Sequence, residues 1–128
     1  NEKINASTFL HVFSIKNESV SFIGTTKPDS VSRLSVYIQL AKAFLQNSEF
    51  LNAEEMLTIS ENYLRLSPIL IKSVKADVFY YVGAMVNLYK KEYEKVFGYY
   101  LALMNHNPNY ENLFRLRKLV SWHLKMER

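Results

Sequence analysis

The sequence predicts an all-α protein that consists of about five to six helices, arranged as antiparallel helix–turn–helix repeats. Glycine and proline number only three each among 128 residues, too few for the many turns of an all-β domain. Hydrophobic residues make up 48% of the chain, which is enough for a sizeable core. The three prolines, Pro28, Pro68 and Pro108, are evenly spaced along the chain. Even spacing of a rare residue is typical of repeat proteins.

The first two predicted helices cover residues 30–47 and 50–66. The stretch LSVYIQLAKAFLQ carries a broad apolar stripe at helical spacing, and Asp29 or Ser30 can cap its start. The tripeptide NSE interrupts the pattern, and FLNAEEMLTISENYLRL resumes it. A short polar link between two amphipathic helices favours an antiparallel pair.

Three more helices are predicted over 69–90, 92–106 and 109–126. Ser67-Pro68 opens the first of them, because proline is tolerated in the first helical turn. Asn107-Pro108 separates the other two, because proline disfavours the helical conformation in the residue before it. The helix at 109–128 is expected to cap a single domain that spans 1–128.

One spacing of mostly apolar residues occurs twice, with offsets 0, 3, 7 and 10 along the chain. The first copy is Phe50, Ala53, Leu57 and Ser60, and the second is Tyr93, Val96, Tyr100 and Leu103. Both copies stand on the second helix of a predicted pair. We therefore expect these residues to pack on the preceding helix.

Residues 1–27 allow two interpretations. FLHVFSI and SVSFIGT flank a KNE turn and are rich in β-branched and aromatic residues, which favours a hairpin. The even proline spacing instead favours a helix of a preceding repeat. A lone two-stranded hairpin is marginal without a sheet to join, so the helix is preferred. Because the chain starts with Asn1 and not Met, we expect it to be a processed form or a fragment of a larger protein.

Two segments of the chain, 37–65 and 80–108, resemble tetratricopeptide (TPR) repeats. That family places an apolar, a small and an aromatic residue on the first helix and opens the second helix with an aromatic. The first segment matches through Tyr37, Leu40, Ala41 and Phe44, followed by the first copy of the spacing. The second matches through Tyr80, Ala84, Asn87, the second copy and Pro108, and it departs at Gly83, Asn87, Val96 and Leu103.

The departures from the TPR pattern and the spacing of the two units lead to two further expectations. Val96 and Leu103 are large where the family prefers small residues, so the second pair of helices should splay. About eight extra residues separate the two units, so the second helix or the link after it should be long. The segment VFYYVGAMVNLYKKEYEKV with NPN is also similar to the second repeat of the mitochondrial fission adaptor family, whose membrane anchor has no counterpart here.

The resemblance implies a right-handed array whose first helices line a concave groove for a protein or peptide partner. Residues on the groove side of these helices are then the candidate contacts: Lys42, Gln46, Tyr81 and Asn87. The resemblance implies a non-catalytic scaffold or adaptor. The alternative is a regulatory or sensory domain of a transcription regulator that dimerises or binds a peptide signal.

The net charge of +4 is concentrated in the last predicted helix. Bases outnumber acids five to one within 113–128, whereas the two are equal in number within 1–112. One interpretation is a solvated capping helix, which repeat arrays need. The other is a site for an acidic partner, whether protein, anionic membrane surface or nucleic acid, formed by Arg115, Arg117, Lys118 and Lys125.

No catalytic, cofactor or metal site is expected. Cysteine is absent, the three histidines are not paired at helical spacing, and the glycines are isolated. Direct nucleic-acid binding is disfavoured because the basic excess is confined to one helix. No apolar stretch approaches the ~18 residues of a membrane span. Together with the lack of cysteine, this favours a cytoplasmic location.

Overall fold

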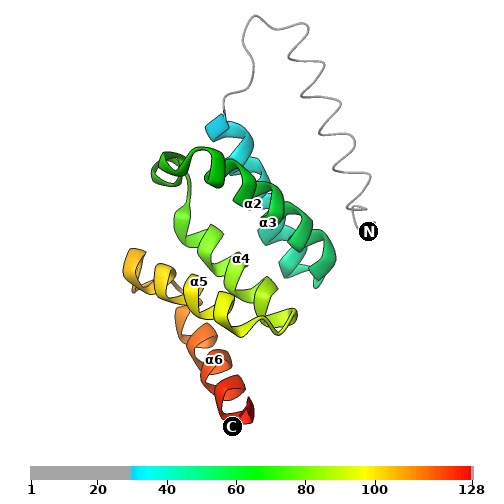
Figure 1. Cartoon of the computed structure of the whole chain (residues 1–128), viewed down its shortest axis with the longest axis vertical. Coiled ribbons are helices and arrows are strands. Elements are labelled where there is room, and N and C mark those ends of the chain that lie inside the picture. The colour runs from blue at the N-terminus through cyan, green and yellow to red at the C-terminus, as the bar shows by residue number, and fades with distance from the viewer. Residues whose placement is uncertain (1–29, 128) are drawn as a thin grey trace, which may run out of the picture.

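The computed structural model describes residues 30–127 and is all-α, as predicted (Figure 1). No strand occurs in this part of the chain. The predicted hairpin or helix within 1–27 lies outside the described residues. The elements are α2 (Ser30–Gln46), α3 (Phe50–Leu66), the 3₁₀ helix η1 (Pro68–Ser73), α4 (Ala76–Tyr89), α5 (Tyr93–His106) and α6 (Leu113–Glu127).

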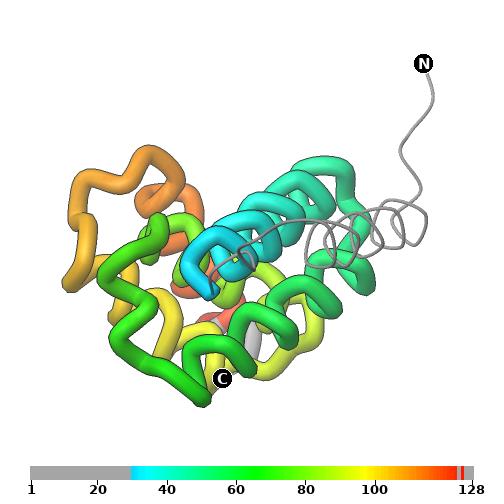
Figure 2. Tube along the Cα trace, turned by 90° about the horizontal axis from the view of Figure 1, so that it is seen from above, coloured from blue at the N-terminus to red at the C-terminus, as the bar shows by residue number. Residues whose placement is uncertain are grey.

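Two helix pairs form the body of the molecule, α2 with α3 and α4 with α5. Figure 2 shows how the chain runs along α2, turns, and returns along α3. Figure 1 shows α4 and α5 below the first pair and α6 at the far end. Helix α4 joins the two pairs, because it packs on both α2 and α3.

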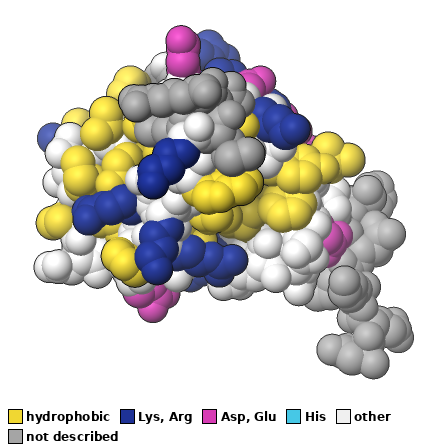
Figure 3. Space-filling model, turned by 90° about the horizontal axis from the view of Figure 1, so that it is seen from below, with side chains coloured by type: hydrophobic (Ala, Val, Ile, Leu, Met, Phe, Trp, Pro, Cys, Tyr) yellow, Lys and Arg dark blue, Asp and Glu magenta, His cyan; other side chains and the backbone are white. Residues whose placement is uncertain are grey.

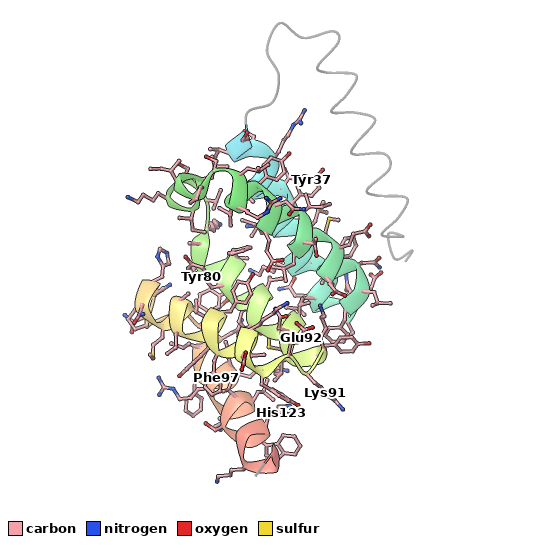
Figure 4. The ribbon with its side chains drawn as sticks, in the orientation of Figure 1. Tyr37, Tyr80, Lys91, Glu92, Phe97 and His123 are labelled. Atoms are coloured by element: carbon pink, nitrogen blue, oxygen red, sulfur yellow. The ribbon has the colours of Figure 1, made fainter. Side chains whose placement is uncertain are left out.

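The turns inside the two pairs have the same conformation. Ser48 follows α2 with a φ of 59°, and Lys91 follows α4 with a φ of 61°. In each turn the N–H of the next residue, Glu49 or Glu92, donates to a carbonyl of the preceding helix at 2.8 and 2.9 Å. Figure 4 labels Lys91 and Glu92 at this point. The left-handed residue reverses the chain tightly enough for the two helices to be antiparallel.

The ends of the two pairs also match. Ser67 and Asn107 have backbone angles of −145° and 83°, and −148° and 84°. Each N–H still donates to the carbonyl one helical turn earlier, and each residue precedes a proline, Pro68 or Pro108. Proline excludes the helical conformation from the residue before it. The spacing of these two prolines therefore reflects two equivalent helix ends.

The predicted helix over 69–90 is in fact two elements. Its first part is η1, and Val74, with φ −125° and ψ 174°, breaks the chain before α4 begins. Leu70 and Ile71 of η1 pack against the core, so this link is held by apolar burial. The link between the two units is therefore long, as predicted, and α3 is also longer than α5, with 17 residues against 14. The last helix likewise starts at Leu113 and not at 109, because Pro108 and its neighbours form a turn.

The second pair approaches closely in spite of its large residues. Val96 and Leu103 are fully buried between the helices. A β-carbon on Gly83 of α4 would lie 2.5 Å from the ring of Tyr99 on α5. The expected splaying of α4 from α5 is therefore absent here, because glycine lets the aromatic ring come against the backbone.

The two helix pairs also share an aromatic contact at the same place. The ring centroids of Tyr37 and Tyr63 are 6.0 Å apart, as are those of Tyr80 and His106. Both contacts join residues at the same separation along the chain, and Figure 4 labels Tyr37 and Tyr80 on their first helices. The described chain is thus two copies of one helix–turn–helix unit followed by α6.

Candidate partner-binding site

A pocket of about 350 Å³ opens where α2, α4 and α6 converge. The C-terminal part of α2 and the turn after it form one side, the middle of α4 forms the base, and the start of α6 forms the other side. The lining residues are Lys42, Leu45, Gln46, Ser48, Phe50, Tyr81, Met85, Asn112 and Arg115. The pocket is therefore built from segments that are distant in sequence, from Lys42 on α2 to Arg115 on α6.

Three of the four predicted groove residues lie together in this pocket. Lys42 and Gln46 are one helical turn apart on α2, so they share a face. Tyr81 reaches the same space from α4. The structure thus brings Lys42, Gln46 and Tyr81 within one cavity.

Asn87 does not join them. It is only 3% exposed, and its Nδ2 donates to the carbonyl oxygen of Gly83 at 2.7 Å. This bond satisfies a buried amide within α4, so the side chain has a structural role. Its position inside the apolar run of α4 is a sequence signal for burial that the groove prediction did not use.

The walls of the pocket combine cations with apolar surface. Leu45, Phe50 and Met85 supply the apolar part. Phe50 is held in place by stacking on Tyr89, with ring centroids 4.4 Å apart and planes 8° from parallel. The sequence prediction missed these residues, since an apolar side chain on a helix is more often core than binding surface.

Lys42 and Arg115 make the pocket positive. None of the lining residues is an acid. Within residues 30–127 the ion pairs are formed by Lys90 with Glu54 and Glu92 and by Lys95 with Glu92, away from this cavity. Arg115 was predicted only as part of the basic helix, and the structure places it in the same pocket as the groove residues. The first helical positions of α6 could not be assigned to the groove from sequence spacing alone.

Tyr81 is a hydrogen-bond donor over a wide pH range. Burial raises the pKa of its phenol, while the positive charge of Arg115 acts in the opposite direction. Its ring packs against Tyr110, with 5.5 Å between the centroids. The hydroxyl group of Tyr81 therefore stays protonated, and able to donate a hydrogen bond, to a higher pH than that of an exposed tyrosine.

The other predicted basic residues lie on the outside of α6. Arg117 Nε donates to the hydroxyl of Tyr100 at 3.0 Å, and Lys118 Nζ lies 4.6 Å from the centroid of the Phe114 ring. Lys125 is exposed. The four predicted bases are thus divided between the pocket, which holds Arg115, and the outer face.

The described part of the chain holds neither a cluster of metal ligands nor a helix that could span a membrane. No group of three or more histidine, aspartate or glutamate side chains in residues 30–127 is placed to hold a metal ion. None of the helices in that range combines the length and apolar character required to cross a bilayer.

Comparison with known proteins gives no family assignment. No protein-family model, no curated protein and no solved structure matches the chain. The resemblance to TPR repeats stays a prediction.

Proposed function

We propose that the chain is a non-catalytic scaffold that binds a peptide segment of a partner protein in the pocket between α2, α4 and α6. One observation carries the proposal: Lys42, Gln46 and Tyr81 meet Arg115 in a single cavity. Stacked helical repeats commonly use such a surface to bind partners, and the TPR resemblance agrees with this use. We further propose that the protein acts in the cytoplasm, in keeping with its lack of cysteine.

The size and chemistry of the pocket favour one or two side chains of a peptide. Its volume, about 350 Å³, is near the lower end for sites that bury a small molecule. Lys42 and Arg115 favour an anionic group on the ligand, and Leu45, Phe50 and Met85 favour an apolar group beside it. An acidic residue next to an apolar residue would satisfy both halves of the site.

A selection experiment tests the proposal. Peptides are selected from a displayed random library against the whole chain, and their dissociation constants are measured on variants. Lys42→Glu with Arg115→Glu should weaken the selected peptides by about tenfold or more, since charge-assisted hydrogen bonds contribute ~1.5–3 kcal/mol.

A matched control replaces two bases outside the pocket with acids, so that the net charge changes by the same amount. Arg65 and Lys72 are exposed and do not line the pocket. Arg65→Glu with Lys72→Glu should leave the dissociation constants unchanged. If both double variants weaken binding equally, long-range charge explains the effect and the pocket proposal is wrong.

A further inference from the structure

The contact between α5 and α6 repeats the contact between α3 and α4. Phe50 begins α3 and stacks on Tyr89 near the end of α4, with 4.4 Å between ring centroids. Tyr93 begins α5 and contacts His123 of α6 at 5.6 Å. Figure 4 shows His123 on α6. Helix α6 therefore lies on α5 as α4 lies on α3, in the position of the first helix of a third unit.

One face of α6 is buried in the same way as the corresponding face of α4. Matching His123 to Tyr89 aligns residues 113–123 of α6 with residues 79–89 of α4, residue by residue. Three buried residues of α4 then correspond to three buried residues of α6: Phe79, Val82 and Val86 to Leu113, Leu116 and Val120. The same face thus packs on the preceding pair in both helices.

The adjacent face of α6 is open. Gly83, Ala84, Asn87 and Leu88 are buried in α4, and the first of them receives the ring of Tyr99 from α5. The corresponding residues of α6 are all exposed: Arg117, Lys118, Ser121 and Trp122. No helix among residues 30–127 covers this face of α6. In α4 it is the face that receives the second helix of the unit.

The open face combines two large aromatic residues with bases. Phe114 is 63% exposed and Trp122 is 56% exposed, and Lys118 lies between them at helical spacing. No acid stands at an exposed position from Phe114 to Lys125. Figure 3 views this end of the molecule and shows Lys and Arg side chains interspersed with hydrophobic ones. Exposed apolar residues of this size beside a concentration of charge are typical of interaction surfaces.

We propose that the open face, formed by Phe114, Arg117, Lys118, Ser121 and Trp122, docks an acidic amphipathic helix of another protein. The partner helix takes the place on α6 that α5 has on α4. Its apolar residues cover Phe114 and Trp122, and its carboxylates meet Arg117 and Lys118, where α4 has a glycine and an alanine. The same face of a second copy does not fit, because its own bases would oppose these. This site is separate from the pocket.

Synthetic peptides test the docking site directly. The probe has about 18 residues, or roughly five helical turns, with leucine and glutamate along one face and no tryptophan. Two matched peptides carry glutamine or lysine in place of glutamate. Trp122 is the only tryptophan of the chain, so its emission reports contact with this face. We expect saturable binding with a blue shift, about tenfold tighter for the glutamate peptide than for the glutamine peptide.

Variants of the chain test whether the peptides bind at the open face of α6. Arg117→Glu with Lys118→Glu should reverse the preference, so that the lysine peptide binds more tightly than the glutamate peptide. Phe114→Ser should weaken every peptide, and Arg65→Glu with Lys72→Glu should change nothing. Circular dichroism melting curves establish that each variant is folded.

Three outcomes would overturn the proposal. The first is no saturable binding of the glutamate peptide, or equal binding of the glutamate and glutamine peptides. The second is binding of phosphatidylserine vesicles or a short single-stranded DNA through these residues without binding of the peptide. The third is a dimer of the chain that Phe114→Ser converts to monomer, since a second copy would then occupy the face.

Discussion

The ring of Tyr99 occupies the space where residue 83 would carry a side chain. A β-carbon on Gly83 would be 2.5 Å from Tyr99 Cδ1. The same ring meets Phe79 edge-on at 5.6 Å, and its hydroxyl donates to Glu61 Oε2 on α3. Tyr99 of α5 therefore links α4 to the first helix pair, and glycine at 83 is what permits the link.

Replacing Gly83 with alanine should destabilise the fold. The added methyl group would meet the aromatic ring and not the mobile end of a long side chain, so the helices must shift. We expect a loss of about 1–3 kcal/mol in the free energy of unfolding, the usual cost of overpacking. Urea denaturation followed by circular dichroism measures it.

Gly98 provides the matched control on α5. Nothing lies within 4 Å of a β-carbon built there, and the residue is exposed. Gly98→Ala should raise stability by up to about 1 kcal/mol, because alanine favours the helix interior over glycine. A loss of stability in Gly98→Ala similar to that in Gly83→Ala would mean that close approach to Tyr99 is not the cause.

The stability of the fold should fall at alkaline pH. Burial, and then the hydrogen bond to Glu61, raise the pKa of Tyr99 far above its ordinary 10.0. Between pH 10 and the higher folded-state pKa, the folded chain keeps a proton that the unfolded chain loses. Stability from this group is therefore fully present below about pH 10 and decreases as pH rises above that value.

Tyr99→Phe tests this dependence. At neutral pH the variant should lose about 1.5–3 kcal/mol with the hydrogen bond to the Glu61 carboxylate. Above pH 10 its free energy of unfolding should decline less steeply than that of the wild type. Burial also raises the pKa of Tyr110 to about 12, so some decline should persist. Identical slopes for wild type and variant in denaturation curves at pH 9 to 11 would contradict the role of Tyr99.

Ala53 marks the close contact of the first pair. It is fully buried on α3, and Ala53→Leu should cost about 1–3 kcal/mol by overpacking. Ala43 on α2 is exposed, so Ala43→Leu is the control and should alter thermal stability little. A melting temperature for Ala53→Leu equal to that of the control would show that the packing of α3 is misplaced.

The helices could be predicted from sequence because their signals are local. The repeated apolar spacing and the residue before each proline depend only on nearby positions, so α2, α3 and α5 agree closely with prediction. The break at Val74 could not be predicted in this way. It follows from how η1 packs against the core, which periodicity does not reveal.

The pocket, too, could be predicted only in part, because local sequence patterns do not reveal contacts between distant segments. Lys42, Gln46 and Tyr81 could be selected because they lie on the side of each first helix that faces away from its partner. Arg115 joins them only because α6 folds back beside α2 and α4. That placement is a tertiary contact between distant segments, so the sequence suggested two separate sites where Arg115 belongs to the pocket.

Methyl NMR of methionine reports directly on whether a peptide binds in the pocket. The chain has four methionines, and Met85 lines the pocket while Met56 is fully buried in the core. With ¹³C-methyl methionine and a selected peptide, we expect the Met85 signal to shift saturably and the Met56 signal to stay in place. Lys42→Glu with Arg115→Glu should abolish the shift. A peptide that binds while the Met85 signal does not move would contradict the account.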